Sequence, residues 1–174
     1  MERLLLQHLR PQTHHALDPL LQFALPGEDG SGGDAIIFLL HQSLSHLDRG
    51  SGTVRITFLD FSSAFNTIQP LLLRDKLTEM GVGSHLVAWI TDYLTGRAPQ
   101  GPVLSPVLFT LYTSDFQYKS ELCHVQKFAD DTAIVGCIRS GQEDEYRELI
   151  KDFVTWCDSN HLLLNTTKTR EMVV

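Results

Sequence analysis

The sequence contains few cysteines and no long apolar run. Cys123, Cys137 and Cys157 are an odd number without metal-like spacing, so we expect reduced thiols. No apolar stretch is long enough to span a bilayer. The apolar stretch at residues 4–6 is too short for a secretory signal. These absences predict an intracellular protein, nuclear or cytoplasmic, with no membrane partner and no secretion.

Positive charge is also scarce. The 174 residues include 14 Lys and Arg against 21 Asp and Glu, which gives a net charge of −7. Proteins that hold a nucleic acid normally present a basic surface, so this balance predicts weak binding unless a basic groove is local. Hydrophobic residues at 43% and charged residues at 20% are ordinary for one globular domain, or one domain with a truncated neighbour.

The spacing of apolar residues predicts a mixture of helices and short strands. Helices are expected at residues 34–48, 70–81, 84–95, 105–116 and 143–160. Strands are expected at residues 54–59, 125–128 and 132–137, and residues 162–164 and 171–174 are expected to form a final strand pair. In the first of these helices, one apolar face is expected, made of Ile36, Ile37, Leu40, Leu44 and Leu47. The order of elements lacks strict βαβ alternation, which favours an α+β fold with helices on one face of an antiparallel sheet.

Three aspartates stand at the ends of predicted strands. Asp60 follows a buried strand, and Asp130 and Asp131 lie at the tip of a predicted hairpin. Clustered carboxylates repel one another unless a cation neutralises them, and carboxylate oxygens suit Mg²⁺. Two such ions can activate a 3′-hydroxyl and stabilise a leaving pyrophosphate. The alternative is a solvated turn, because aspartate is common in turns.

The sequence segments around these acids resemble motifs of the reverse transcriptases of LINE-type (non-LTR) retrotransposons. Residues 60–66 (DFSSAFN) resemble motif A, 100–109 (QGPVLSPVLF) motif B, 128–131 (FADD) motif C and 165–170 (NTTKTR) motif D, in the order of that family. The resemblance covers nearly the whole chain. It implies a polymerase palm-like sheet with partial fingers and no thumb, divided into residues 1–52 (fingers) and 53–174 (palm).

The resemblance also implies a role for each matching residue. Asp60 and Asp130 would bind two Mg²⁺ ions, with Asp131 in support, as the catalytic and metal-binding set. Phe65 would exclude the 2′-hydroxyl of a ribonucleotide, and Lys168 would protonate or steady the pyrophosphate. The residues implied to bind nucleotide are Phe61, Phe65, Gln100, Gly101 and Lys168. The implied partners are an RNA template, a DNA primer and deoxynucleotides, and the oligomeric state is left open.

Some segments depart from the family pattern. Only Ala98 and Pro99 separate Arg97 from Gln100, where the family has a strand pair, so an internal deletion is expected near residues 97–100. Residues 25–33 carry two acids and no Lys or Arg, where basic residues are expected to grip the triphosphate. No thumb or endonuclease region is expected within the chain.

Three interpretations follow. The first is an RNA-directed DNA polymerase domain fragment with two-metal nucleotidyl transfer. The second is an inactive retrotransposon remnant or non-enzymatic interaction module. A phospho-receiver also clusters aspartates with a lysine, but there the adjacent pair precedes the single aspartate, and here Asp60 comes first.

Overall fold

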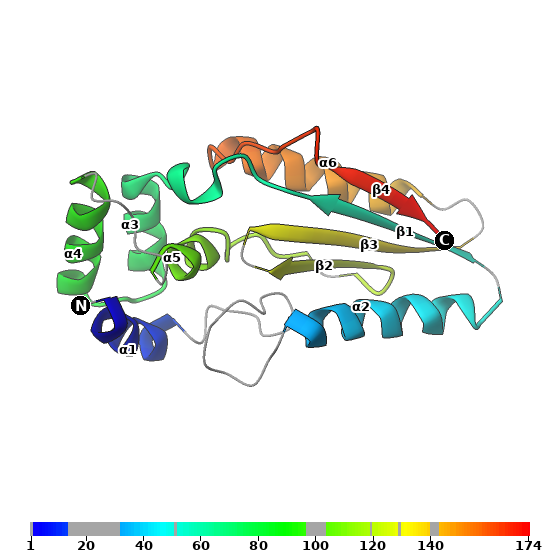
Figure 1. Ribbon diagram of the computed structural model, residues 1–174, viewed down its shortest axis with the longest axis horizontal. Coiled ribbons are helices and arrows are strands. Elements are labelled where there is room, and N and C mark those ends of the chain that lie inside the picture. Colours follow the sequence, from blue (N-terminus) through cyan, green and yellow to red (C-terminus); the bar gives the residue numbers. More distant parts are fainter. Residues whose placement is uncertain are drawn as a thin grey trace.

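The computed structural model describes residues 2–13, 32–50, 52–96, 104–118, 120–128, 130–139 and 143–174. Its elements follow the chain in the order shown in Figure 1. They are α1 (Glu2–Thr13), α2 (Gly32–Leu47), β1 (Gly52–Leu59), the 3₁₀ turn η2 (Ala64–Asn66), α3 (Pro70–Glu79), α4 (Ser84–Thr95), α5 (Leu104–Tyr112), β2 (Cys123–Phe128), β3 (Asp131–Arg139), α6 (Asp144–Ser159) and β4 (Arg170–Val173).

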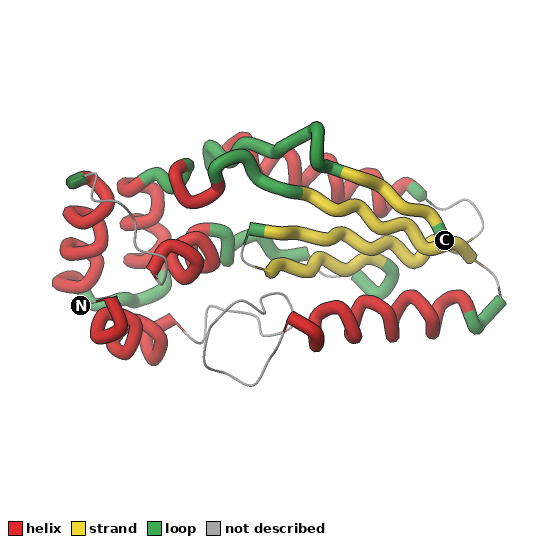
Figure 2. The backbone as a smooth tube through the Cα atoms, in the orientation of Figure 1, coloured by secondary structure: helices red, strands yellow, loops and turns green. Residues whose placement is uncertain are grey.

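The four strands form one antiparallel sheet in the order β2-β3-β1-β4, drawn in yellow in Figure 2. β2 and β3 form the expected hairpin, in which Phe128 pairs with Asp131. β4 pairs with β1, and Leu164 forms a single bridge to Phe61. The expected pairing of residues 162–164 with 171–174 is therefore wrong. Both segments instead align with β1 and its continuation, whose free edge offers more backbone partners than a short hairpin would.

Helices cover both faces of the sheet. On one face, Ile134 and Ile138 of β3 join the main core with Phe153 of α6 and residues of α5. On the other face, Val54 and Val135 form a smaller cluster with Leu39 and Leu47 of α2. Figure 1 shows α6 and α2 running along opposite sides of the sheet. The α+β class and the antiparallel sheet are confirmed, and the sheet carries helices on two faces rather than one.

α2 buries a different face from the one its apolar residues predict. Ile37, Leu40 and Leu44 are 63%, 54% and 57% exposed. The buried positions include Ser43 and His46, and His46 Nε2 lies 3.1 Å from the carbonyl oxygen of Ile138. Of the predicted apolar face, Leu47 packs against the sheet, while polar residues take other inward positions, because a polar side chain that finds a backbone partner can face a sheet as well as a leucine.

α6 lies close to the sheet at a glycine of β3. A Cβ atom built on Gly136 would lie 2.6 Å from Cδ2 of Tyr146, and the Tyr146 hydroxyl lies 2.6 Å from Thr57 Oγ1. Gly136 thus leaves room for the tyrosine ring, which then bonds to the central strand β1.

The remaining helices gather beyond the end of the sheet at which β1 ends and β3 begins (Figure 1). α3 begins at Pro70, as expected from the preference of proline for the first helical turn. Within the described residues, no helix is long and apolar enough to cross a membrane. The three cysteines are free and buried, as expected.

Candidate active site

Strand pairing places the first aspartate beside the hairpin acids. The β1–β3 register ends with Leu59 opposite Thr132. One further step along both strands brings Asp60 opposite Asp131, at the hairpin turn that also carries Asp130. Side chains directly opposite in an antiparallel pair lie within contact range. Acids from two distant stretches of sequence therefore meet at one end of the sheet.

The electrostatics of the acids agree with this placement. Burial raises the pKa of the Asp131 carboxyl, and the negative charges of Asp130 and Asp60 raise it further. Lys168 acts in the opposite direction. The charges of Asp130 and Asp60 thus disfavour ionisation of Asp131, as expected where a cation is needed to hold the acids together.

Lys168 places a positive charge beside Asp60. Its Nζ lies 2.9 Å from Oδ2 of Asp60, although the lysine side chain itself is 67% exposed. The contact with Asp60 raises the pKa of Lys168 above its ordinary value. Asp60 Oδ2 is shielded from solvent and accepts no hydrogen bond, so this ion pair is its one close polar contact among the residues that the structure describes.

Backbone hydrogen bonds attach the turn of Lys168 to the strand end. The amide of Asn165 donates to the carbonyl oxygen of Asp60 at 2.8 Å, and the amides of Lys168 and Thr169 donate to that of Asn165 at 3.1 and 3.0 Å. The Ser62 amide donates to the Leu163 carbonyl oxygen at 2.7 Å. The lysine is therefore positioned by the same strand end that carries its partner.

The donor set matches a cation site that is completed by substrate. In the described part of the chain, no three His, Cys, Asp or Glu residues are grouped closely enough to hold a metal ion by themselves. Mg²⁺ commonly uses only one or two protein carboxylates and takes its other ligands from water and phosphate. Asp60, whose shielded Oδ2 is paired with the exposed Lys168, and the neighbouring hairpin acids fit that second kind of site.

Two aromatic rings follow Asp60 and pack on the same helix. Phe61 is buried and its ring centroid lies 5.5 Å from that of Phe109 in α5. The half-buried Phe65 ring lies 5.8 Å from Phe109 in an edge arrangement. Both side chains thus contact the core, and their proposed contacts with nucleotide stay predictions. Gln100, Gly101 and the expected deletion near residues 97–100 lie outside the described residues.

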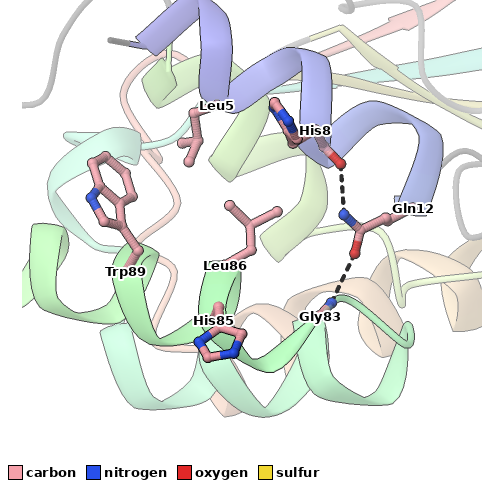
Figure 3. A pocket seen from close by; sticks show the side chains of 7 residues that line it. All are labelled: Leu5, His8, Gln12, Gly83, His85, Leu86 and Trp89. Carbon is pink, nitrogen blue, oxygen red and sulfur yellow. Dashed lines mark hydrogen bonds between the residues drawn. The ribbon is translucent and has the colours of Figure 1, made fainter.

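A separate hollow of about 490 Å³ lies between α1 and α4 (Figure 3). Leu5, Leu86 and Trp89 form its apolar wall, and the side chain of Gln12 bridges the His8 carbonyl oxygen and the Gly83 amide, both at 2.8 Å. None of the candidate site residues lines this hollow. The Gln12 bridge links α1 to the residue before α4, and this hollow is separate from the acid cluster.

The sequence interpretation missed two buried lysines, Lys76 and Lys127. Lys127 follows Cys123 and Val125 at alternate positions of β2, all three of which are buried. A lysine at the inward position of an alternating strand is a detectable signal, because an isolated ammonium is rarely buried without partners.

The fold and the acids together define a palm-like polymerase domain. The chain belongs to the reverse transcriptase (RNA-dependent DNA polymerase) family, whose model matches residues 1–173. No curated protein matches the sequence.

Solved telomerases share the fold. Telomerase from Candida tropicalis, in complex with a TWJ fragment of telomeric RNA, superposes with a TM-score of 0.69 at 9% identity, over 98% of this chain and 33% of that chain. The corresponding Candida albicans complex gives a TM-score of 0.61 at 15% identity, also over 98% of this chain and 33% of that chain. The protein spans about a third of these telomerase chains.

Proposed function

We propose that this chain is the fingers-and-palm portion of a LINE-type (non-LTR) retrotransposon reverse transcriptase. Residues 1–52 would form partial fingers and residues 53–174 the palm. Four sequence motifs in family order support this assignment, together with the family match over residues 1–173. Its substrates would be an RNA template, a DNA primer and deoxynucleotides.

The observation that carries the proposal is the meeting of Asp60 with the hairpin acids. Asp60 and Asp130 would hold two Mg²⁺ ions, and Asp131 would support them. When bound, such a pair of ions makes the primer 3′-hydroxyl a better nucleophile and stabilises the charge of the leaving pyrophosphate. The shielded position of Asp60 Oδ2 supports this role, since a buried carboxylate oxygen needs a positive charge beside it, and in the structure Lys168 supplies that charge.

Other side chains would orient the nucleotide. Phe65 would contact the sugar of the incoming nucleotide, and its packing on Phe109 supports a fixed ring that excludes a 2′-hydroxyl. Lys168 would steady or protonate the pyrophosphate. Its raised pKa keeps the ammonium charged at neutral pH and tightens its hold on the proton, which supports the steadying role more than proton transfer. Phe61, Gln100 and Gly101 would complete the nucleotide contacts.

Mn²⁺ binding, measured by electron paramagnetic resonance, tests the acid cluster without requiring turnover. We expect Asp60→Asn and Asp130→Asn each to weaken binding at least about tenfold, because each removes a charged ligand. Asp92→Asn, which changes an exposed acid on α4, is the matched control and should bind as the wild type does. Equal affinity in all four proteins would contradict the proposed site.

We expect no processive DNA synthesis by this chain on a primed RNA template with Mg²⁺ and deoxynucleotides. The net charge of −7 and the two acids in residues 25–33 disfavour a firm hold on a polyanion. A primer-extension assay measures this directly. Robust extension that is lost in Asp130→Asn would overturn the expectation of inactivity and would support a working polymerase.

The exposed stripe on α2 favours a second candidate function. Ile37, Leu40 and Leu44 present apolar surface away from the sheet, which suits a non-enzymatic interaction module derived from a retrotransposon. This alternative predicts wild-type Mn²⁺ binding in Asp130→Asn, and it predicts that Leu40→Gln changes the oligomeric state measured by sedimentation.

A further inference from the structure

Two lysine side chains lie in the main core, at the C-terminal end of α5. Lys76 of α3 and Lys127 of β2 are only 7% and 4% exposed. Their ammonium nitrogens lie 5.4 Å from the Trp156 ring centroid in both cases. Four elements, α3, α5, β2 and α6, therefore meet around two buried cations.

Lys127 connects the hairpin strand to the segment that follows α5. Its Nζ donates to the carbonyl oxygens of Thr113 and Phe116, at 2.6 and 3.2 Å, and lies 5.5 Å from the Phe116 ring centroid. The end of a helix carries unpaired carbonyl groups and a partial negative charge. A cation at this point donates hydrogen bonds to the carbonyl groups and offsets the partial negative charge.

Lys76 makes a different set of contacts. Its Nζ donates to the Tyr112 carbonyl oxygen at 2.7 Å, to Asp115 Oδ1 at 2.8 Å and to Asn160 Oδ1 at 2.5 Å. These acceptors join α3 to α5 and to the end of α6, and none belongs to the β2–β3 hairpin. Lys76 therefore serves as a natural control for Lys127.

The charge of Lys127 is not explained by stability. The pKa of its ammonium is lowered to about 8, mainly by burial and in smaller part by Lys76, while Asp115 and Cys157 oppose the shift. A desolvated cation is costly, and an apolar side chain of similar length is often as stable at such a position. The contacts that the ammonium makes, rather than the burial of the chain, distinguish lysine from methionine here.

Both acid-bearing segments are held by contacts with α5 or with the residue that directly follows it. Phe61 and Phe65, which follow Asp60, pack on Phe109 of α5. Lys127, which precedes the Asp130–Asp131 turn, is bonded to the end of α5. One segment is held by ring contacts and the other by an ammonium.

We propose that Lys127 is a positioning residue, which fixes the Asp130–Asp131 turn against the C-terminal end of α5 and so keeps it aligned with Asp60. The inference rests on the proposed function of the acids. Lys127 does not contact the reacting groups and acts through the hairpin backbone.

Hydrogen exchange of the intact chain tests the placement independently of metal binding. We expect Lys127→Met to speed exchange of the amides of Phe128, Asp131 and Thr132 on the order of tenfold, with the centre of β3 unchanged. Lys76→Met should leave those amides as in the wild type and speed exchange at the ends of α3 and α6. Unchanged exchange at the turn in Lys127→Met, or an equal increase throughout the sheet, would overturn the proposal.

Mn²⁺ affinity provides the functional readout. Lys127→Met should bind Mn²⁺ about tenfold more weakly than the wild type, as expected when a support of a ligand is removed, and Lys76→Met should not. Wild-type affinity in Lys127→Met would overturn the positioning role. A wild-type protein that binds no Mn²⁺ would overturn the proposed function alone, because the exchange result still decides whether Lys127 holds the turn.

Lys127→Gln covers the case in which the methionine variant does not fold. It keeps an N–H donor and removes the charge, and the same turn-specific exchange is expected. If neither variant folds, Lys127 is required for the fold as a whole, and a specific positioning role is rejected.

Discussion

Two lysines act on the same acids from regions with opposite physical character. Lys168 lies in an exposed turn, contacts Asp60 directly, and has a raised pKa because of that contact. Lys127 lies in the core, bonds to carbonyl groups, and has a pKa lowered by burial. The exposed lysine affects the charge of the acids, whereas the buried one affects where they are. The contacts at the surface therefore account for the charge of the acids, and the contacts in the core account for their position.

Removing the Phe109 ring of α5, on which the aromatic residues after Asp60 pack, has the largest expected effect. Phe109 is fully buried and contacts both Phe61 and Phe65. We expect Phe109→Ala to lower the free energy of unfolding by about 3–5 kcal/mol, measured by urea denaturation. Val154→Ala, at a 37% exposed position of α6, should cost less than about 1 kcal/mol. A small loss in Phe109→Ala would contradict the view that α5 holds the segment that follows Asp60.

The pH dependence of stability sharpens the comparison between the two lysines. Lys127 loses its proton near pH 8 in the folded chain and near its ordinary pKa of 10.5 in the unfolded chain. The unfolded state thus binds more protons between these values, so stability rises with pH. Relative to Lys127→Met, the wild type should gain on the order of 1 kcal/mol from pH 7 to pH 9, measured by denaturation at each pH.

The other shifted groups cancel in that difference to first order, because Cys123 and Tyr146, with raised pKa values, are present in both proteins. A flat or falling difference would show that Lys127 is not desolvated. Lys168 should behave oppositely. Its pKa is raised on folding, so its contribution is present below pH 10.5 and is lost as the pH rises through the folded pKa.

The smallest expected effect is on the acids themselves. Lys168 lowers the pKa of Asp131 against the effects of burial, Asp130 and Asp60. Lys168→Met should therefore raise the pKa of Asp131 further, measured by carboxyl-carbon NMR during a pH titration. Lys151→Met, at an exposed position of α6, should leave it unchanged. An unshifted Asp131 in Lys168→Met would break the proposed link between the turn and the hairpin.

The sequence predicts the acid cluster well because the relevant signals are local. Alternating apolar residues before Asp60 and on both sides of Asp130–Asp131 indicate strands and a tight turn, and the antiparallel register then follows. The α+β class and the hairpin were predictable in this way, and the reverse transcriptase family from the resemblance of four motifs in order.

Contacts between distant elements were not predictable from those signals. The apolar spacing of α2 indicates a buried stripe, yet His46 faces the sheet because the Ile138 carbonyl oxygen is there to receive it. Lys127 finds two carbonyl acceptors in the segment that follows α5, 11 to 14 residues away. Neither partner can be read from the neighbouring sequence.

The central place of β1 in the sheet has a consequence for synthesis of the chain. Both of its partners, β3 and β4, come later in the sequence, at residues 131–139 and 170–173. β1 therefore leaves the ribosome long before either partner is available, with Leu59, which packs in the main core, still uncovered. Such late closure of non-local pairs slows folding and exposes nascent chains to aggregation, so the strand that precedes Asp60 waits longest for its pairing within the sheet.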